Sequence, residues 1–368
     1  MSKHIQTKET KKRSSNNEAN KKQEKQENQN NEVKKKPSKK NIQKKRRRRT
    51  VLLILLILFI ALGIFVGVRI HNAGGNLLAA LMGHNKYTRE NLDKLQVLIL
   101  GESTGMSDTI VVAQYDPKTQ EAALLSIPRD TFVGDNINRA TSNDKINAKY
   151  SHGETPQETI NAVNELTGLN IQKYILVDTK ALNKLVDVIG GLDFNVPMDM
   201  NYDDASQDLH IHLTAGQQKL TGNQVEQLVR FRHNNDGSSY YRVYGVGEDF
   251  GRMRTQREAI IALGKQSLKL KNVTEIFEII DILKSYVKTN INLDEIKDYV
   301  PYAIEMNMDN IKTGQVPGSD GPSNIGVYVF NPDKEATKEL VQELFYGITP
   351  EQEEDGNNTS ENNTTSND

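Results

Sequence analysis

The hydrophobic positions of this chain form one long uninterrupted run, followed by many short ones. The long run, Val51–Val68, contains no charged residue, and fifteen of its eighteen residues are Leu, Ile, Phe or Val. Eighteen residues of helix span roughly 27 Å at about 1.5 Å per residue, which is close to the hydrocarbon thickness of a bilayer. A helix packed on the core of a soluble domain usually keeps a polar face, and a signal peptide would have a shorter apolar core. The run therefore predicts a transmembrane helix over residues 51–68.

After this predicted span, short apolar or β-branched stretches alternate along the sequence with helical patterns. Residues 69–95 are expected to form a stalk with a short helix near residues 77–82. We expect strands at residues 97–100, 109–115, 121–127, 174–177, 192–196, 210–213, 311–316 and 326–330. We expect helices after Thr155 and Thr221, and over residues 182–189, 252–270, 274–286, 292–306 and 334–345. The alternation predicts an α/β fold with helices layered on one sheet.

Two of these helices have a specific start signal. The segments Thr155-Pro156-Gln157-Glu158 and Thr221-Gly222-Asn223-Gln224 both match the capping box, in which the first and fourth side chains bond each other's backbone N–H. Gly168 is expected to end the first helix, and Pro301 to interrupt the pattern over residues 292–306.

The charges are divided between the two sides of the predicted span. Residues 1–50 hold 19 Lys or Arg and 5 Asp or Glu, whereas the rest of the chain holds 28 and 43. This division excludes a simple cytosolic globule. Arg46–Arg49 adjoin the apolar run, and only Arg69 follows it closely, so residues 1–50 are expected in the cytoplasm and residues 69–368 outside the plasma membrane.

The two ends of the chain are expected to be disordered. Residues 1–50 are rich in Lys, Asn, Gln and Glu and lack aromatic residues, which is typical of a lipid-attracted tail and disfavours nucleic-acid binding. Residues 347–368 consist mainly of Glu, Asn, Thr and Ser.

Two residue types, Cys and Trp, are absent from the chain, and their absence excludes several kinds of site. The chain has no Cys, which excludes disulfides, thiolate metal sites and a Cys nucleophile. It also has no Trp, so an aromatic surface for carbohydrate would use Tyr or Phe.

Arginines are concentrated where the strand and helix patterns meet. Arg230 and Arg232 are two apart, which places both on one face of a strand. Arg252 and Gln256 are four apart, on one face of a helix, and Arg129 follows a strand. One guanidinium group can bind two phosphate oxygens at once. If these arginines converge, they would therefore suit a ligand with adjacent phosphates. A solvated surface position is the alternative for each arginine alone.

One carboxylate is a candidate metal ligand. Asp108 follows a glycine-bearing loop and precedes a strand, a position from which it could hold Mg²⁺, which prefers one or two carboxylates plus phosphate oxygens. A turn-capping role is the alternative.

Three short matches to other chemistry are weaker. Gly101–Gly105 fits the G-x-S-x-G nucleophile pattern, but a strand is expected where that motif needs a helix. Asp249-Phe250-Gly251 matches the kinase metal-binding triplet without its companion motifs. His210 and His212 alternate on a strand and could ligate a metal, but no third ligand is evident, which favours a hydrated strand face.

Six segments occur in the order found in one known family. The strings LILGESTGMSDTIVV, LLSIPRDTFV, DKINAKYSHG, VDVIGGLDFNVP, LTGNQVEQLVRFRH and DFGRMRTQRE resemble those of the LytR–CpsA–Psr family of cell-envelope enzymes. The resemblance covers residues 96–270 as a catalytic domain and residues 271–346 as a C-terminal extension packed on it.

This resemblance implies a three-layer α/β/α sandwich around one mixed sheet. It also implies transfer of a glycopolymer, such as a teichoic acid or polysaccharide, from a polyprenyl-diphosphate carrier onto peptidoglycan through a phosphodiester. By position, Asp108 resembles the Mg²⁺ ligand, and Arg129 the principal diphosphate-binding arginine. Asp249 resembles the carboxylate that supports the arginines or takes the acceptor proton. The remaining diphosphate contacts would be Arg230, Arg232, Arg252 and Gln256.

Two departures from the family pattern concern the site. Ser103 stands where the family usually has Asp, so Glu102 beside it becomes the possible second metal ligand. The segment Asn234–Glu248 is longer than usual and contains Tyr240, Tyr241 and Tyr244, which could stack on sugars at the acceptor side or form a surface loop.

Two other functions stay open. One is a non-catalytic envelope-binding or regulatory module, because the Asp and the adjoining Arg that the family usually has in the 101–105 loop are both missing. The other is a serine hydrolase that uses Ser103, with a base among His152, His210, His212 and His233.

Overall fold

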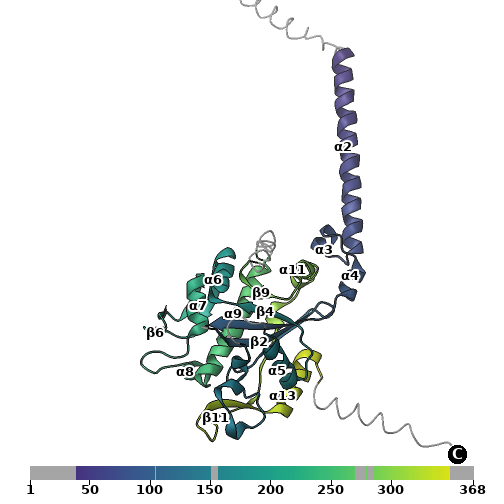
Figure 1. Ribbon diagram of the computed structural model, residues 1–368. Helices are drawn as coiled ribbons and strands as arrows, with labels where there is room; N and C mark the ends of the chain where they lie inside the picture. Colours follow the sequence, from purple (N-terminus) through teal and green to yellow (C-terminus); the bar gives the residue numbers. More distant parts are fainter. Residues whose placement is uncertain (1–38, 104, 151–155, 270–278, 280–284, 349–368) are drawn as a thin grey trace, which may run out of the picture. The chain divides into compact units, whose positions relative to one another are not determined.

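The computed structural model describes residues 39–103, 105–150, 156–269, 279 and 285–348 (Figure 1). The chain divides into two compact units, residues 1–69 and 70–368. The first unit contains most of helix α2 (Lys39–Asn72), whose segment Ile54–Asn72 is long and apolar enough to cross a membrane. The predicted span is therefore helical.

The helix begins earlier than expected. Residues 39–50 belong to α2, whereas the sequence pattern predicted disorder up to residue 50. Lys, Arg and Gln are good helix formers, and adding residues to an existing helix is far easier than nucleating a new one. The apolar segment therefore extends its helix into the basic segment.

The second unit is built on a six-stranded mixed sheet in the order β10-β3-β2-β1-β4-β9. Strand β1 pairs antiparallel with β2 and parallel with β4, and β3 pairs antiparallel with β2 and parallel with β10. The strands are β1 (Leu95–Ser103), β2 (Met106–Asp116), β3 (Glu121–Ser126), β4 (Lys173–Val177), β9 (Lys288–Thr289) and β10 (Lys312–Gln315).

One face of the sheet is covered by helices α5 (Gln157–Thr167) and α13 (Lys334–Val341), the latter continuing as a π-helical turn, Gln342–Tyr346 (Figure 1). Alternation along β1 turns Leu98 and Leu100 to this face, where both are fully buried. They pack in one cluster with Val163 of α5 and Phe345 of the π-helical turn.

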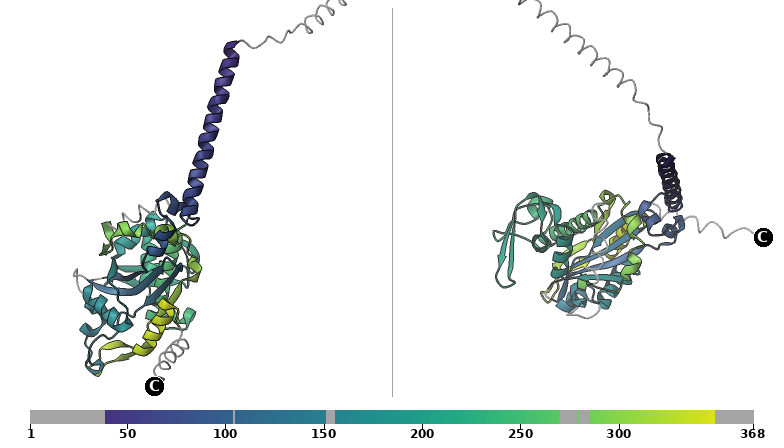
Figure 2. Two further views of the ribbon diagram at one scale, coloured as in Figure 1. Left: turned by 90° about the vertical axis from the view of Figure 1, so that its right-hand side faces the viewer. Right: turned by 90° about the horizontal axis from the view of Figure 1, so that it is seen from above.

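The other face carries α6 (Thr179–Val188), α7 (Gly222–Arg230) and α9 (Glu248–Ser267) (Figures 1 and 2). Two small sheets belong to this layer, β5 (Leu192–Val196) with β8 (Gly216–Leu220), and β6 (Met200–Asp204) with β7 (Leu209–Leu213). The layer has a core of its own, centred on residues such as Leu192, Leu228 and Phe231. The predicted three-layer α/β/α architecture is confirmed.

Among the described residues, the helix caps agree with the predictions from the sequence. Thr221 and Gln224 form the predicted capping box at the start of α7. Gly168 ends α5 in the left-handed conformation, as predicted. The N-cap of α5 is Pro156, and Thr155 and most of the expected helix 274–286 lie outside the described residues.

Two peripheral regions differ from expectation. The expected stalk folds on the domain: the Asn76 side chain, at the start of α3 (Leu77–Leu81), donates to Pro301 O at 2.7 Å. Between the expected strands at 311–316 and 326–330, the chain forms an additional strand, β11 (Gly318–Pro322), paired with β12 (Tyr328–Pro332). The remaining short elements are α4 (Lys86–Asn91), α8 (Tyr241–Tyr244), α11 (Leu293–Ile296), α12 (Val300–Ala303) and the 3₁₀ turns Ile137–Arg139, Ser142–Asp144, Ile146–Lys149 and Met308–Asn310.

Candidate active site

A cavity of about 580 Å³ separates the sheet from its second helical layer. Its apolar walls come from the sheet and from α6, α7 and α9, namely Ile99, Ile175, Val177, Leu182, Leu185, Val225, Val229, Ala259, Ile260 and Leu263. The helices of this layer bury much of their apolar surface in their own core, which leaves a space between them and the sheet.

Seven of the eight predicted site residues line this one cavity. They come from five separate parts of the chain and are Glu102, Asp108, Arg129, Arg230, Arg232, Arg252 and Gln256. The eighth, Asp249, contacts two of these arginines. The convergence that the sequence predicted is therefore present.

A β-bulge directs Asp108 into the cavity. The pairing of β1 with β2 matches Gly101 with Thr109 but Glu102 with Ser107, so Asp108 is the extra residue. Consecutive residues of a regular strand point to opposite faces, whereas here Asp108 and Thr109 both line the cavity. The short hairpin between β1 and β2 thus positions the candidate metal ligand.

Arg129 lies just beyond the end of β3, and its Nη1 donates to Asp108 Oδ1 at 2.7 Å. Its Nε lies 3.7 Å from Asp130 Oδ2, and Asp130 in turn is bound by Lys145 at 2.7 Å. Burial disfavours the charged guanidinium, but the hydrogen bond to Asp108 and the charges of Asp249, Asp108 and Asp130 outweigh it and raise the pKa of Arg129.

Asp249, in the first turn of α9, holds two of the arginines. Its Oδ1 lies 2.8 Å from Nη2 of Arg252 and 3.1 Å from Nε of Arg232. The Arg252 side chain is only 7% exposed, and its buried Nε has no hydrogen-bond partner among the described residues. Burial lowers the pKa of Arg252, and the charges of Arg129 and Arg232 lower it further against the opposing effect of Asp249. The arginines are therefore close enough to act on one ligand together.

The placement of Arg230 and Arg232 corrects the sequence prediction. They do not lie on a strand: Arg230 is the last residue of α7, and Arg232 follows the cap residue Phe231. Both side chains still reach the cavity because the chain becomes extended at Phe231. Arg230 Nη1 lies 3.0 Å from Glu226 Oε1, one helical turn earlier.

Gln256 connects α9 to α7. Its Nε2 donates to the carbonyl oxygen of Val229 at 3.0 Å, near the end of α7. Arg252 and Gln256 lie on the buried face of α9, as the four-residue spacing predicted.

In the Asp249-Phe250-Gly251 triplet, Phe250 and Gly251 serve to pack α9 against its neighbours. Phe250 packs edge-on against Phe330 of β12. A Cβ atom on Gly251 would lie 2.2 Å from Cβ of Tyr240, so only glycine allows this close approach. Tyr240 is fully buried, whereas Tyr241 of the same segment is 69% exposed. None of the three tyrosines, Tyr240, Tyr241 and Tyr244, lines the cavity.

The nucleophile elbow is not formed. Ser103 ends β1 and pairs with Met106 at the start of β2, so a strand follows it, as the sequence predicted. Of the four candidate bases, His152 lies outside the described residues and His233 lines the cavity. His210 and His212 lie on β7 beside an unforeseen third partner, Asp203. Glu102, the possible second metal ligand, accepts a hydrogen bond from Tyr150 Oη at 3.0 Å.

The structure also brings in an acidic residue that the sequence did not single out. Asp320, on β11, has its pKa raised by burial and then by the charges of Asp249 and Asp130. No sequence signal marked this residue, because it approaches the site only through the pairing of β11 with β12.

Comparison with known proteins agrees with this arrangement. The model of the LytR_cpsA_psr family matches residues 5–345. The chain belongs to the LytR_cpsA_psr family. One relative, the polyisoprenyl-teichoic acid–peptidoglycan teichoic acid transferase TagV of Bacillus subtilis (strain 168), is 30% identical over 250 residues, which cover 66% of this chain and 61% of TagV. TagU of Bacillus cereus, a transferase of the same description, is 26% identical over 244 residues, covering 66% of this chain and 74% of TagU.

The fold of this family member is also found in a solved relative. The crystal structure of B. subtilis TagV matches with a TM-score of 0.55 at 28% identity, covering 70% of this chain and 99% of that structure. Four of the six segments that carry the family resemblance supply polar residues of the cavity, namely those of β1–β2, the end of β3, α7 and α9. The family signature is thus concentrated on the cavity walls.

Proposed function

We propose that this protein transfers a glycopolymer, such as a teichoic acid, from a polyprenyl-diphosphate carrier onto peptidoglycan. One observation carries the proposal: a single cavity combines apolar walls with a cluster of arginines. A prenyl diphosphate has the same division into an apolar chain and a diphosphate. The match to TagV spans 61% of that transferase, whose described activity supports the same reaction here.

The reaction requires positioning and charge stabilisation. An acceptor hydroxyl oxygen forms a bond to the phosphorus that carries the polymer, the bond from that phosphorus to the bridging oxygen breaks, and prenyl phosphate leaves. We assign Arg129, Arg230, Arg232 and Arg252 to the phosphate oxygens, where fixed guanidinium groups stabilise the developing negative charge. Gln256 holds the α7–α9 junction and adds an amide to the same wall.

Asp249 suits a positioning role better than that of a base. Its carboxylate accepts contacts from both Arg232 and Arg252, and it does not line the cavity. We therefore propose that it holds these two guanidiniums toward the diphosphate, and that the proton of the acceptor hydroxyl passes to solvent or to the departing prenyl phosphate.

The donor set fits a Mg²⁺ ion. The four guanidiniums in the cavity are outnumbered by the carboxylates that line it or contact its arginines, namely Glu102, Asp108, Asp130, Asp178, Glu226 and Asp249. Binding a multiply charged diphosphate therefore favours an added cation, and Mg²⁺ is commonly held by one or two carboxylates together with phosphate oxygens. Asp108, with Glu102 as a second ligand, would hold the ion, whose charge would neutralise part of the diphosphate.

We further propose that α2 anchors the protein in the plasma membrane with its N-terminus in the cytoplasm. The basic residues Arg46–Arg49 precede the span, and positive charge is retained on the cytoplasmic side. This orientation places the cavity outside the plasma membrane, on the same side as the peptidoglycan.

The test compares Arg129→Ala with wild type and with Arg254→Ala. Arg254 also lies on the domain's arginine-rich helix α9, but it pairs with Glu258 and does not line the cavity. The assay measures release of prenyl phosphate from a short synthetic prenyl-diphosphate-linked saccharide with peptidoglycan fragments and Mg²⁺. Loss of a fixed positive charge at the reacting phosphate should lower the rate about 100-fold or more in Arg129→Ala, and Arg254→Ala should match wild type.

Two outcomes would contradict the proposal. Equal rates for Arg129→Ala and wild type would exclude the diphosphate role of Arg129. Binding of the lipid without release of prenyl phosphate would instead identify a non-catalytic binding module.

A further inference from the structure

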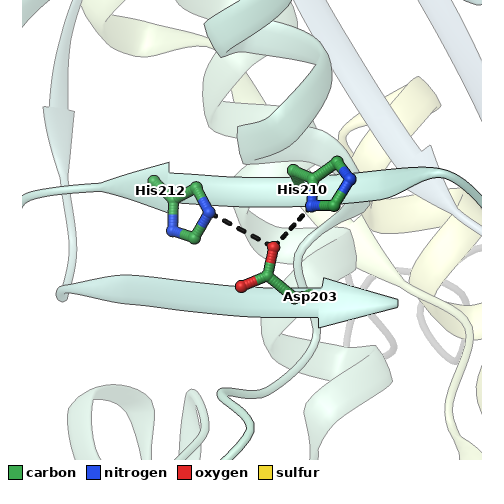
Figure 3. A group of neighbouring side chains, drawn as sticks. All are labelled: Asp203, His210 and His212. Atoms are coloured by element: carbon green, nitrogen blue, oxygen red, sulfur yellow. Dashed lines mark hydrogen bonds and ion pairs between the residues drawn. The ribbon is translucent and has the colours of Figure 1, made fainter. Parts of the chain in front are cut away.

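The hairpin of β6 and β7 carries a polar cluster that the proposed transfer reaction does not use. Its strands alternate: Leu209, Ile211 and Leu213 of β7 are buried, whereas His210 and His212 are exposed. The register places Asp203 directly opposite His210, and Asn201 opposite His212. The two imidazoles and the Asp203 carboxylate therefore gather on the outer face of the hairpin (Figure 3).

The ligand atoms of this cluster all lie within 4.8 Å of one another. His210 Nδ1 lies 2.6 Å from Asp203 Oδ1, and His212 Nε2 lies 3.3 Å from the same oxygen. Ligands about 2.0–2.1 Å from a tetrahedral Zn²⁺ ion are about 3.3–3.4 Å apart. The His212–Asp203 separation already has that value, and the His210–Asp203 separation would have to widen by about 0.7 Å. The side chains are about half exposed, so they are free to make this adjustment.

The far nitrogen of one imidazole also has an acceptor, because His212 Nδ1 lies 2.8 Å from Asn201 Oδ1. The far nitrogen of His210 lies 3.8 Å from Asp208 Oδ1, beyond hydrogen-bond distance. A neutral imidazole that donates from its far nitrogen presents a lone pair from the near one. Without an ion, His210 Nδ1 lies at hydrogen-bond distance from Asp203 Oδ1, with a proton between them. A metal ion would take the place of that proton and accept the lone pairs of both near nitrogens. An outer partner such as Asn201 is typical of histidines that ligate metals.

Side chains from outside the hairpin hold its backbone around the cluster. The N–H of Asp203 donates to Asn235 Oδ1 at 2.8 Å, and the N–H of His212 donates to Gln227 Oε1 of α7 at 3.0 Å. The opposite face of the hairpin contributes Tyr202 and Leu209 to the wall of the cavity, and the connecting turn contributes Gln207. An ion on the outer face would therefore also fix one wall of the cavity.

We propose that Asp203, His210 and His212 bind a divalent transition-metal ion, with Zn²⁺ as the expected occupant. Imidazole ligands favour Zn²⁺ over Mg²⁺, and the absence of Cys leaves nitrogen and oxygen donors as the available set. The ion would keep an open position toward solvent and would join the two strands at the cavity wall. Its role is structural, and it is separate from the Mg²⁺ proposed at Asp108.

The test is calorimetric titration of ZnCl₂ into the full-length, untagged protein in detergent with excess MgCl₂. Wild type should bind one Zn²⁺ per chain at this site, and His210→Ala, His212→Ala and Asp203→Asn should each weaken binding at least about 100-fold. Asn201→Ala, which removes only an outer partner, should weaken it about 10- to 100-fold. His71→Gln, an exposed histidine of α2, serves as the matched control and should bind as wild type does.

A second measurement does not depend on calorimetry. Hydrogen exchange of residues 200–213 should slow on addition of Zn²⁺ in wild type but not in His212→Ala, with circular dichroism showing that both are folded. Equal Zn²⁺ binding by wild type and all three ligand variants would overturn the proposal, as would no binding by wild type at millimolar Zn²⁺. Neither result bears on the transferase proposal, which is tested with Mg²⁺ alone.

Discussion

Replacing Asp249 by Asn tests whether this carboxylate exists to hold Arg232 and Arg252. The change keeps the size of the side chain and removes the charge that both guanidiniums contact at 3.1 and 2.8 Å. Removing one partner of a fully buried ion pair costs about 3–5 kcal/mol. Because 32% of Asp249 is exposed, water replaces part of the lost interaction, and we expect a loss of about 2 kcal/mol in the free energy of unfolding. For a domain of this size, that loss lowers Tm by roughly 4–8 °C.

The assay is thermal unfolding of the full-length protein in detergent, with and without farnesyl diphosphate. In Asp249→Asn the two arginines lack an anionic partner, so the diphosphate should raise Tm more in the variant than in wild type. Glu258→Gln is the control, because it makes the same kind of change at an exposed ion pair on the same helix. That exposed pair should contribute less than about 1 kcal/mol.

An unchanged Tm in Asp249→Asn would contradict this role of the carboxylate, as would an equal rise in Tm with farnesyl diphosphate in both proteins. The first result would mean that the ion pairs add nothing to stability. The second would mean that the diphosphate does not take the place of the carboxylate.

Three further predictions follow from other parts of the domain. Gly251→Ala should lose about 3 kcal/mol or more in the free energy of unfolding, because the added Cβ would lie 2.2 Å from Cβ of Tyr240. Gly247→Ala is the control, since the nearest atom to its added Cβ is 3.7 Å away, and it should not show this loss. Leu263→Lys, which places a charge in the apolar wall, should weaken binding of farnesyl diphosphate at least about 10-fold and leave pyrophosphate binding unchanged, as measured by calorimetry. The hydrogen bond to Asp203 raises the pKa of His210, so the ion pair is fully formed below the unfolded histidine pKa and is lost as pH rises through the folded value. NMR of labelled histidines should show Asp203→Asn lowering the pKa of His210 toward its ordinary value, and an unchanged pKa would contradict the pairing.

The cavity and the arginine cluster depend on each other. Buried guanidiniums need anionic partners, and the protein supplies them from Asp108, Asp249 and Glu226. These partners keep the site stable before a ligand binds. A diphosphate then competes for the same arginines, so the site is organised for an anion before the anion arrives.

The sequence by itself determined the local features of this protein. The uncharged apolar run required a helix, the short apolar run at residues 97–100 required a buried strand, and Thr221 with Gln224 capped α7. The order of six segments indicated the family and the residues of the site. These properties depend on periods and spacings of a few residues, which can be read without knowing what packs against what.

Only the tertiary structure decided how distant residues meet. It placed Arg230 at a helix end rather than on a strand, turned Asp108 inward through a bulge, and brought β11 with Asp320 beside the site. It also gave His210 and His212 the partner Asp203, because the register of β6 with β7 sets these residues opposite one another. Register, bulges and contacts between layers are fixed by the packing of the whole domain, and no short stretch of sequence contains that information.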